Sequence, residues 1–213
     1  MPSTGLGRQE KARLAREKVL DAAERLLRAD PGATFSMRDL AVEAEVSFAT
    51  PFNQYGSKAA IAQALSARRI TQMIGRLAAA KPAGDAVERT LAAVRIAIDL
   101  LLEEPGVNRA MMGVLGAWSS SPGTVSAHSS ALWSAALGDF EGIDANLVPV
   151  AKVRLPAQLA LVFRGCLSFW VAGEIADQDL PKTAENAAAI TLACFVEPAR
   201  REALLVGWSD RVG

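Results

Sequence analysis

The sequence predicts an all-α protein built from two helical domains. Apolar residues recur at the three- and four-residue spacing of amphipathic helices, and the alternating pattern of β-strands is nearly absent. Short segments with Pro and Gly separate the helical stretches from one another. Of the 213 residues 51% are apolar, and the mean hydropathy is +0.19. The chain therefore has enough apolar surface for a core and for a further interface or internal pocket.

The first two helices are predicted from their apolar spacing and from their ends. The first contains the apolar residues of 19–27 and ends at the Asp-Pro-Gly segment 30–32. The second carries an i, i+3, i+4, i+7 stripe within residues 37–44. Ser36 lies at its N-cap and Asp39 at the N3 position, so an approximate capping box is expected.

The next two helices lead to a domain boundary. A short third helix follows Ser47, which is expected to cap it, and Pro51 falls in its first turn, where a proline is tolerated. A fourth helix begins at Ser57 and ends at the Lys-Pro-Ala-Gly segment 81–84. The predicted parts are an N-terminal helical domain at 1–56, a connecting helix at 57–84 and a C-terminal helical domain at 85–213.

The remaining helices follow from the same periodicity and from the Pro- and Gly-containing breaks between them. The break from Gly142 to Pro156 is expected to be the longest of them. The helices are expected at 85–104, 106–117, 124–140, 156–177 and 182–197, with a short one near 199–207.

The formal net charge of zero hides an asymmetry along the chain. Residues 1–84 carry thirteen Lys and Arg against eight Asp and Glu, and residues 85–213 carry ten against fifteen. No acidic residue occurs from Val46 to Gly84. This asymmetry fits an N-terminal part that binds a polyanion and a C-terminal part that does not.

Residues 36–55, SMRDLAVEAEVSFATPFNQY, have the pattern of a helix-turn-helix: an amphipathic helix, a turn and a second short helix. A recognition helix must enter the major groove, so its outward face carries small or polar side chains. Phe52 and Tyr55 are expected either to pack on the earlier helices or to contact the sugar-phosphate backbone. The small and polar candidates are Ala49, Thr50, Asn53 and Gln54.

The segment from Val19 to Leu65 resembles the TetR/AcrR family of transcriptional regulators. The matching marks, in order, are LDAA in the first helix, MRDLA in the second, VS in the turn, an aromatic-rich third helix and GSK opening the fourth. The resemblance implies a homodimer that places two recognition helices in successive major grooves, and a C-terminal domain that senses a ligand. It also implies that Lys58 holds a backbone phosphate beside the N-terminus of the fourth helix, where a cation and free N–H groups attract an anion.

The chain departs from this family pattern at the turn and in the third helix. Glu45 occupies the turn position usually filled by Gly, and a left-handed conformation there costs about 1 kcal/mol or more. Phe52 replaces the usual Tyr and lacks its phosphate-binding hydroxyl. Asn53 and Gln54 stand where Tyr and His are usual. Because both amides can bond an adenine edge, we expect an operator half-site that contains A·T pairs.

Contacts to DNA are expected to divide by chemistry. Ser36, Ser47, Thr50 and Lys58 are expected on phosphates. The N-terminal arm from Arg8 to Lys18 either reaches the adjacent backbone or minor groove or is a solvated, charged start of the first helix. The residues expected to face base edges are Arg38, Phe48, Ala49, Asn53 and Gln54.

Large, adaptable side chains gather on the middle helices of the C-terminal domain. Singly each is typical of a core, but several Trp and Met together favour an apolar pocket for an apolar or aromatic inducer. His128, the only histidine, is expected on the surface or at a helix cap. The candidate pocket residues are Met111, Met112, Leu115, Trp118, Trp133, Phe163, Leu167 and Trp170.

The helices at 156–177 and 182–197 are expected to form the homodimer interface, because their apolar stripes are wider than one core contact needs. Arg164 and Glu174 are expected to pair across the dimer, to stay solvated or to meet an acidic ligand. Cys166 and Cys194 are expected to be small core residues rather than a disulfide or a metal site. The first stripe includes Leu159, Val162, Phe163, Cys166, Phe169, Trp170 and Gly173.

The sequence does not contain the motifs of other classes of protein. A single His excludes a di-iron enzyme, and no zinc-protease motif, phosphate loop or Cys/His pair occurs, so we expect no enzyme, no metal and no cofactor. Residues 155–173 are the best candidate for a membrane span, but Gln158 and Arg164 disfavour it. No signal-type segment opens the sequence, so a cytoplasmic protein is expected.

The sequence thus favours a cytoplasmic, homodimeric regulator that binds double-stranded operator DNA and leaves it when a small apolar or aromatic molecule binds. Repression is the expected mode, although activation would require no different sequence. The alternative is a helical ligand-binding or protein-adaptor module without operator binding.

Overall fold

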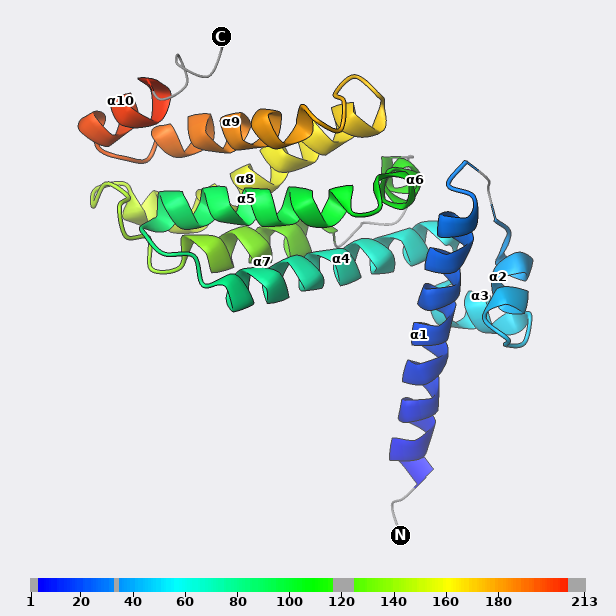
Figure 1. Cartoon of the computed structure of the whole chain (residues 1–213). Helices are drawn as coiled ribbons and strands as arrows, with labels where there is room; N and C mark the ends of the chain where they lie inside the picture. Colours follow the sequence, from blue (N-terminus) through cyan, green and yellow to red (C-terminus); the bar gives the residue numbers. More distant parts are fainter. Residues whose placement is uncertain (1–3, 33–34, 117–124, 207–213) are drawn as a thin grey trace. The chain divides into compact units, whose positions relative to one another are not determined.

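The computed structural model describes residues 4–32, 35–116 and 125–206, and all regular structure in these ranges is helical (Figure 1). The prediction of an all-α protein is confirmed. The helices are α1 Thr4–Ala29, α2 Met37–Glu43, α3 Ala49–Tyr55, α4 Lys58–Ala80, α5 Ala86–Leu102, α6 Pro105–Gly116, α7 Val125–Leu137, α8 Val148–Val171, α9 Leu180–Ala193 and α10 Pro198–Val206.

The chain divides into two compact units, and the division differs in place from the predicted domain boundaries. Unit 1 contains residues up to Ser66 together with the segment that starts at Glu104. Unit 2 contains residues 67–103 and the segment from Gly123 onward. Helix α4 therefore contributes to both units, and α6 belongs to the same unit as the predicted helix-turn-helix. The three-part division predicted from the sequence stays a prediction.

Unit 1 is built on α1. In Figure 1, α2 and α3 lie beside the C-terminal half of α1, while its N-terminal half extends beyond them. Its core is formed by apolar residues that the sequence placed on helical stripes, which explains why these helices form and pack as predicted. Among the buried residues of this unit are Val19, Ala22, Ala23, Leu40, Ala41, Ile61 and Leu65.

Unit 2 is a bundle in which α5, α7, α8 and α9 pack against one another. Trp133 of α7 and Phe163 of α8 meet edge to face, with ring centroids 5.1 Å apart. Trp170 is fully buried and donates its indole N–H to Asp177 at 2.7 Å. The largest buried side chains of this unit also include Ile98, Leu101, Leu132, Leu137, Leu155, Leu159 and Leu180.

Helix α8 shows the largest error in the sequence prediction. It begins at Val148 and continues through Pro156, whereas the sequence suggested a break up to Pro156. Pro149 in the first turn is favourable, because the first N–H groups of a helix have no partner in any case. Pro156 is buried inside the bundle, so packing compensates for the backbone hydrogen bond that it cannot form. Propensity alone could not reveal this compensation.

The other boundaries differ less. Helix α1 begins at Thr4, so the segment expected as an arm is the first part of α1. Helix α8 ends at Val171, shortly before Gly173, whose φ of 80° suits a left-handed stop. No helix in the described ranges combines the length and the apolar character that crossing a membrane requires.

Candidate nucleic-acid interface

Helix α2 has the cap that the sequence predicts. The N–H of Asp39 donates to Oγ of Ser36 at 3.1 Å, and the N–H of Ser36 donates to Oδ2 of Asp39 at 2.8 Å. The hydrogen bond from the Ser36 backbone lowers the pKa of the Asp39 carboxyl below its usual range. Met37, Leu40 and Ala41 are buried below this cap. Ser36 therefore starts the helix, and its hydroxyl is already used as an acceptor.

The turn between α2 and α3 contains a strained residue. Glu45 has a φ of 53°, so it adopts the left-handed conformation whose cost was considered above. The N–H of Val46 donates to the carbonyl of Ala41 at 3.0 Å, and the N–H of Glu45 donates to that of Val42 at 3.1 Å. These bonds satisfy the last carbonyls of α2 and direct the chain into α3.

Helix α3 begins one residue later than the predicted cap implies. Its N-cap is Phe48, which makes no side-chain cap bond, so the assignment of that role to Ser47 is wrong. The Ser47 hydroxyl instead pairs with the Thr50 hydroxyl at 2.8 Å, and the Thr50 N–H donates to the Ser47 carbonyl at 2.9 Å. These two bonds form a tight turn before the helix. The first helical residue of α3 is therefore Ala49.

The outer face of α3 is exposed, and its inner face is anchored by Pro51. Pro51 is buried, whereas Ala49 and Asn53 are exposed. The rings of Phe48 and Phe52 are 56% and 55% exposed. This exposure makes the face available for contact.

Helix α3 is fastened to α1 at its C-terminal end. The Arg16 guanidinium donates to the carbonyl of Gln54 at 3.0 Å and stacks 4.6 Å from the centre of the Tyr55 ring. The Tyr55 hydroxyl donates to the carbonyl of Arg16 at 3.0 Å. Of the two expected roles of Tyr55, the structure thus describes packing on an earlier helix. Arg16 was expected only as part of the basic arm, and its contacts with α3 could not be predicted, because its partners lie thirty-eight and thirty-nine positions away in the chain.

Two cations border the α3 face. The Arg38 guanidinium lies 5.0 Å from the centre of the Phe48 ring, so it is held close to α3 by a cation–π contact. Lys58 is exposed at the start of α4 and donates to the carbonyl of Phe35 at 3.0 Å. Ser57 caps α4 by accepting from the N–H of Ala60 at 3.1 Å. Lys58 thus combines its own charge with the positive end of a long helix.

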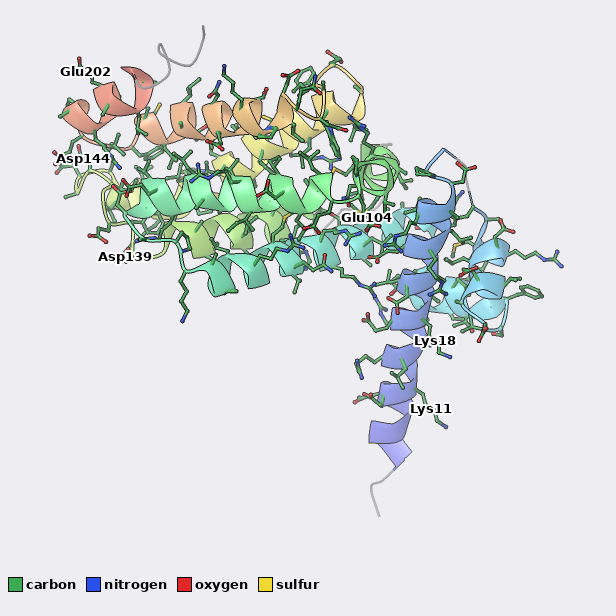
Figure 2. The ribbon with its side chains drawn as sticks, viewed as in Figure 1. Lys11, Lys18, Glu104, Asp139, Asp144 and Glu202 are labelled. Atoms are coloured by element: carbon green, nitrogen blue, oxygen red, sulfur yellow. The ribbon has the colours of Figure 1, made fainter. Side chains whose placement is uncertain are left out.

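The first part of α1 carries the charged residues that were expected in an arm. Figure 2 shows the side chains of Lys11 and Lys18 along it, and their seven-residue spacing puts them on one face. Arg13 pairs with Glu10 at 2.6 Å, and the pair is well exposed. This description matches the solvated, charged helix start, while the contact with DNA stays a prediction.

The residues expected to line a ligand pocket lie in both units. Met111 and Met112 are buried and Leu115 is half-buried on α6 of unit 1. Trp133, Phe163, Leu167 and Trp170 are buried in unit 2, and the Trp133 indole N–H finds no acceptor on the described residues. Trp118 lies outside the described residues.

Unit 1 also contains an apolar cavity that the sequence analysis missed. Its walls come from α1, α4, α6 and the segment before α2, and Met111 is the only predicted pocket residue among them. Its helical apolar wall residues belong to ordinary apolar stripes, so no sequence signal separates them from core, and Lys58 was expected on a DNA phosphate instead.

The described residues thus define a helix-turn-helix protein: a capped α2, a turn and an exposed α3 in unit 1, with a separate helical bundle in unit 2. Comparisons with family models and with curated proteins find no match. Among solved structures, the chain is similar to a TetR transcriptional regulator from Rhodococcus sp. RHA1, with a TM-score of 0.70 and 19% identity. The match covers 85% of this chain and 97% of the other. The chain therefore has the fold of TetR transcriptional regulators, as its sequence resemblance implied.

Proposed function

We propose that this protein is a homodimeric transcriptional repressor that binds operator DNA through α2 and α3 and releases it when a small apolar or aromatic molecule binds. The observation that carries the proposal is the exposed face of α3, with Asn53 on it and the cations Arg38 and Lys58 beside it. An amide can read a base edge, and the cations can neutralise phosphates. The fold of TetR regulators supports the same role.

The homodimer is proposed to form through α8 and α9. These helices expose large apolar side chains, among them Leu161 at 65%, Phe169 at 54% and Ile190 at 52%. Such exposure is typical of surfaces that another chain covers. Of the stripe expected at this interface, Leu159, Phe163, Cys166 and Trp170 are buried in unit 2, so they belong to the core instead.

Arg164 lies on the same helix. Burial lowers the pKa of its guanidinium, which forms no ion pair or hydrogen bond with the described residues. It could pair with an acidic group of the second subunit or of a ligand, which are two of the three roles expected from the sequence.

Induction is proposed to change the separation of the two recognition helices. The helices of a dimer must match half-sites about 34–36 Å apart, or multiples of this distance. An inducer among Trp133, Phe163, Leu167 and Trp170 would have to repack the core of unit 2. The coupling is reciprocal, so operator DNA must weaken inducer binding by the same factor by which the inducer weakens DNA binding.

The proposal is tested by selecting operator sequences from random duplexes with the full-length protein, and then measuring binding by fluorescence anisotropy. The expected result is saturable binding to a two-part site, with an affinity that falls steeply as salt increases. Selection of no sequence, together with equal and weak retention of all duplexes at low salt, would overturn the proposal.

The second candidate is a helical ligand-binding or protein-adaptor module without operator binding. The exposed rings of Phe48 and Phe52 favour it, because apolar rings also suit a protein partner. The same selection separates the two candidates, since an adaptor enriches no DNA sequence.

A further inference from the structure

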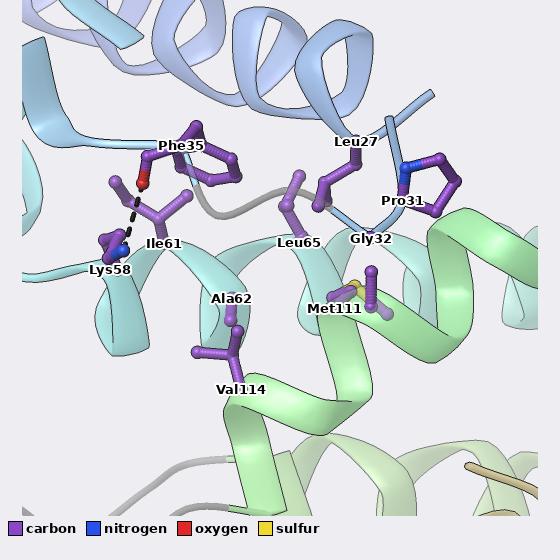
Figure 3. Close-up of a pocket in the computed structure, with 11 residues that line it drawn as sticks. Leu27, Pro31, Gly32, Phe35, Lys58, Ile61, Ala62, Leu65, Met111 and Val114 are labelled. Atoms are coloured by element: carbon purple, nitrogen blue, oxygen red, sulfur yellow. Dashed lines mark hydrogen bonds between the residues drawn. The ribbon is translucent and has the colours of Figure 1, made fainter. Parts of the chain in front are cut away.

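An apolar cavity of about 150 Å³ lies within unit 1 (Figure 3). Its walls include Leu27 of α1, Ile61 and Leu65 of α4, and Met111 and Val114 of α6. An apolar cavity of this size is large enough for a benzene ring.

The walls of the cavity are tied together by contacts outside it. Arg28, near the end of α1, forms an ion pair with Glu104, just before α6. Gly106 at the start of α6 packs so closely on Pro31 that a Cβ there would lie 3.1 Å from Pro31 Cγ. The cavity therefore exists without a ligand, so a ligand does not have to open it.

One charged group borders this apolar space. Lys58 lines the cavity at the end opposite Pro31, and its ammonium donates to the carbonyl of Phe35. An ammonium has three donors, and no carboxylate of the described residues forms an ion pair with this one. A ligand that suits the cavity thus has a small apolar body and one anionic group.

We propose that this cavity is an effector site for a small aromatic monocarboxylate, which places its ring between α1, α4 and α6 and its carboxylate on the Lys58 ammonium. The site is separate from the inducer pocket proposed in unit 2. Its effect on DNA rests on the proposed function: the carboxylate takes the ammonium that would otherwise hold a DNA phosphate. Release then occurs by direct competition, without a change in the separation of the recognition helices.

The binding test uses benzoate as the probe and full-length protein with ¹³C-labelled methionine methyl groups. Benzoate should saturably shift the Met111 methyl signal, because an aromatic ring beside it changes its local field, and should leave the Met73 signal in place as an internal control. Benzamide has the same shape without the charge, and should bind about tenfold more weakly. In the Lys58→Met variant this preference for benzoate should disappear.

Two cavity-filling variants test the location. Ala62→Leu adds carbon atoms inside the cavity, and Val114→Phe closes its rim; either should abolish the Met111 shift. Ala64→Leu, on the same helix but outside the lining, is the matched control and should bind benzoate like the wild type. An unmoved Met111 signal up to the solubility limit of benzoate would overturn the site, as would unchanged binding to both cavity-filling variants.

The DNA test is read separately. Benzoate should displace a selected operator from the wild type but not from Ala62→Leu, relative to sodium acetate at equal ionic strength. Operator binding that persists on benzoate-saturated protein would overturn the competition. If no DNA binds in the absence of benzoate, the proposed function fails, and the Met111 signal still decides whether the cavity is a carboxylate site.

Discussion

At the scale of single residues, the turn and α3 show how a short segment is divided between scaffold and surface. Pro51 faces inward and Tyr55 is bonded to α1, so both fix the helix. Asn53 and Phe52 face outward and do not hold the helix in place. The sequence named Asn53 as an outward-facing residue but left two roles open for Phe52 and Tyr55, because a seven-residue helix has too few turns for a periodic pattern.

The first prediction concerns the strain at Glu45. Replacing it with Gly removes a left-handed penalty of about 1–2 kcal/mol but adds chain entropy to the unfolded state, so Glu45→Gly should raise the unfolding free energy by about 0.5–1 kcal/mol. Urea denaturation followed by circular dichroism measures the change. Glu45→Ala is the control, because it removes the carboxylate and retains the strain; equal stabilisation by Ala would show that charge, not backbone strain, is responsible.

The second prediction separates two kinds of DNA contact. Lys58→Ala should weaken binding to all duplexes alike and reduce the slope of log affinity against log salt by about one unit. Asn53→Ala should instead relax the preference at one base position and leave the salt slope unchanged. Anisotropy titrations on a selected operator and its single-base variants measure both effects. Identical behaviour of the two variants would show that the assigned roles are wrong.

At the scale of elements, charged side chains close the helix ends of unit 2. Asp85 caps α5 by accepting from the N–H groups of Val87 and Glu88. The Asp85 N–H in turn donates to the Glu88 carboxylate at 2.7 Å. Arg89 covers the end of α7 by donating to the carbonyls of Ala136 and Leu137. The Arg89 contacts were not visible in the sequence, because their acceptors lie on another helix, forty-seven and forty-eight positions along the chain.

The third prediction follows from this cap. The hydrogen bond from the Asp85 N–H, supported by Arg200, lowers the pKa of Glu88 in the folded state. Its contribution to stability is therefore complete above the unfolded-state pKa of about 4.3 and is lost as pH falls through the lowered value. Glu88→Gln should lower the free energy of unfolding at pH 7. The decrease should be less than about 1 kcal/mol, because the Glu88 side chain is half exposed.

The difference between wild type and Glu88→Gln should shrink as pH falls below about 4.3. Thermal unfolding across this pH range measures it, and Glu197→Gln, at an exposed carboxylate outside the cap, is the control. A difference that stays constant with pH would show that the charge of Glu88 has no part in the cap.

At the scale of the whole molecule, the helices of unit 2 bury one set of apolar residues and expose another. Trp170 of α8 and Leu192 of α9 are buried in the bundle, whereas Leu161 and Phe169 of α8 and Ile190 of α9 are exposed. A wide apolar stripe predicts both a core and an interface, which is why the sequence indicated the right helices but assigned several core residues to the interface.

The fourth prediction tests that interface. Leu161→Arg places a charge on the proposed contact surface and should convert the dimer to a monomer, while the monomer retains its helical circular dichroism. Sedimentation equilibrium measures the mass. Gln178→Arg adds the same charge in the segment between α8 and α9 and should remain dimeric. A dimer that survives Leu161→Arg and Phe169→Glu would show that the subunits meet elsewhere.

Local physics determined much of this protein from its sequence alone. The helical periodicity, the Ser36–Asp39 cap and the order of the helices follow from residues near one another in the chain, so their pattern is readable without a fold. The short motifs that carry the family resemblance are local in the same sense, and the fold agrees with the resemblance.

Only the tertiary structure decided what each apolar or charged side chain meets. It placed α6 in the same unit as the helix-turn-helix, continued α8 through Pro156, bonded Arg16 to Tyr55 and formed a cavity beside Lys58. The physical reason is that burial and pairing depend on neighbours distant in the chain. An apolar stripe has the same sequence whether it lines a core, a cavity or a subunit interface.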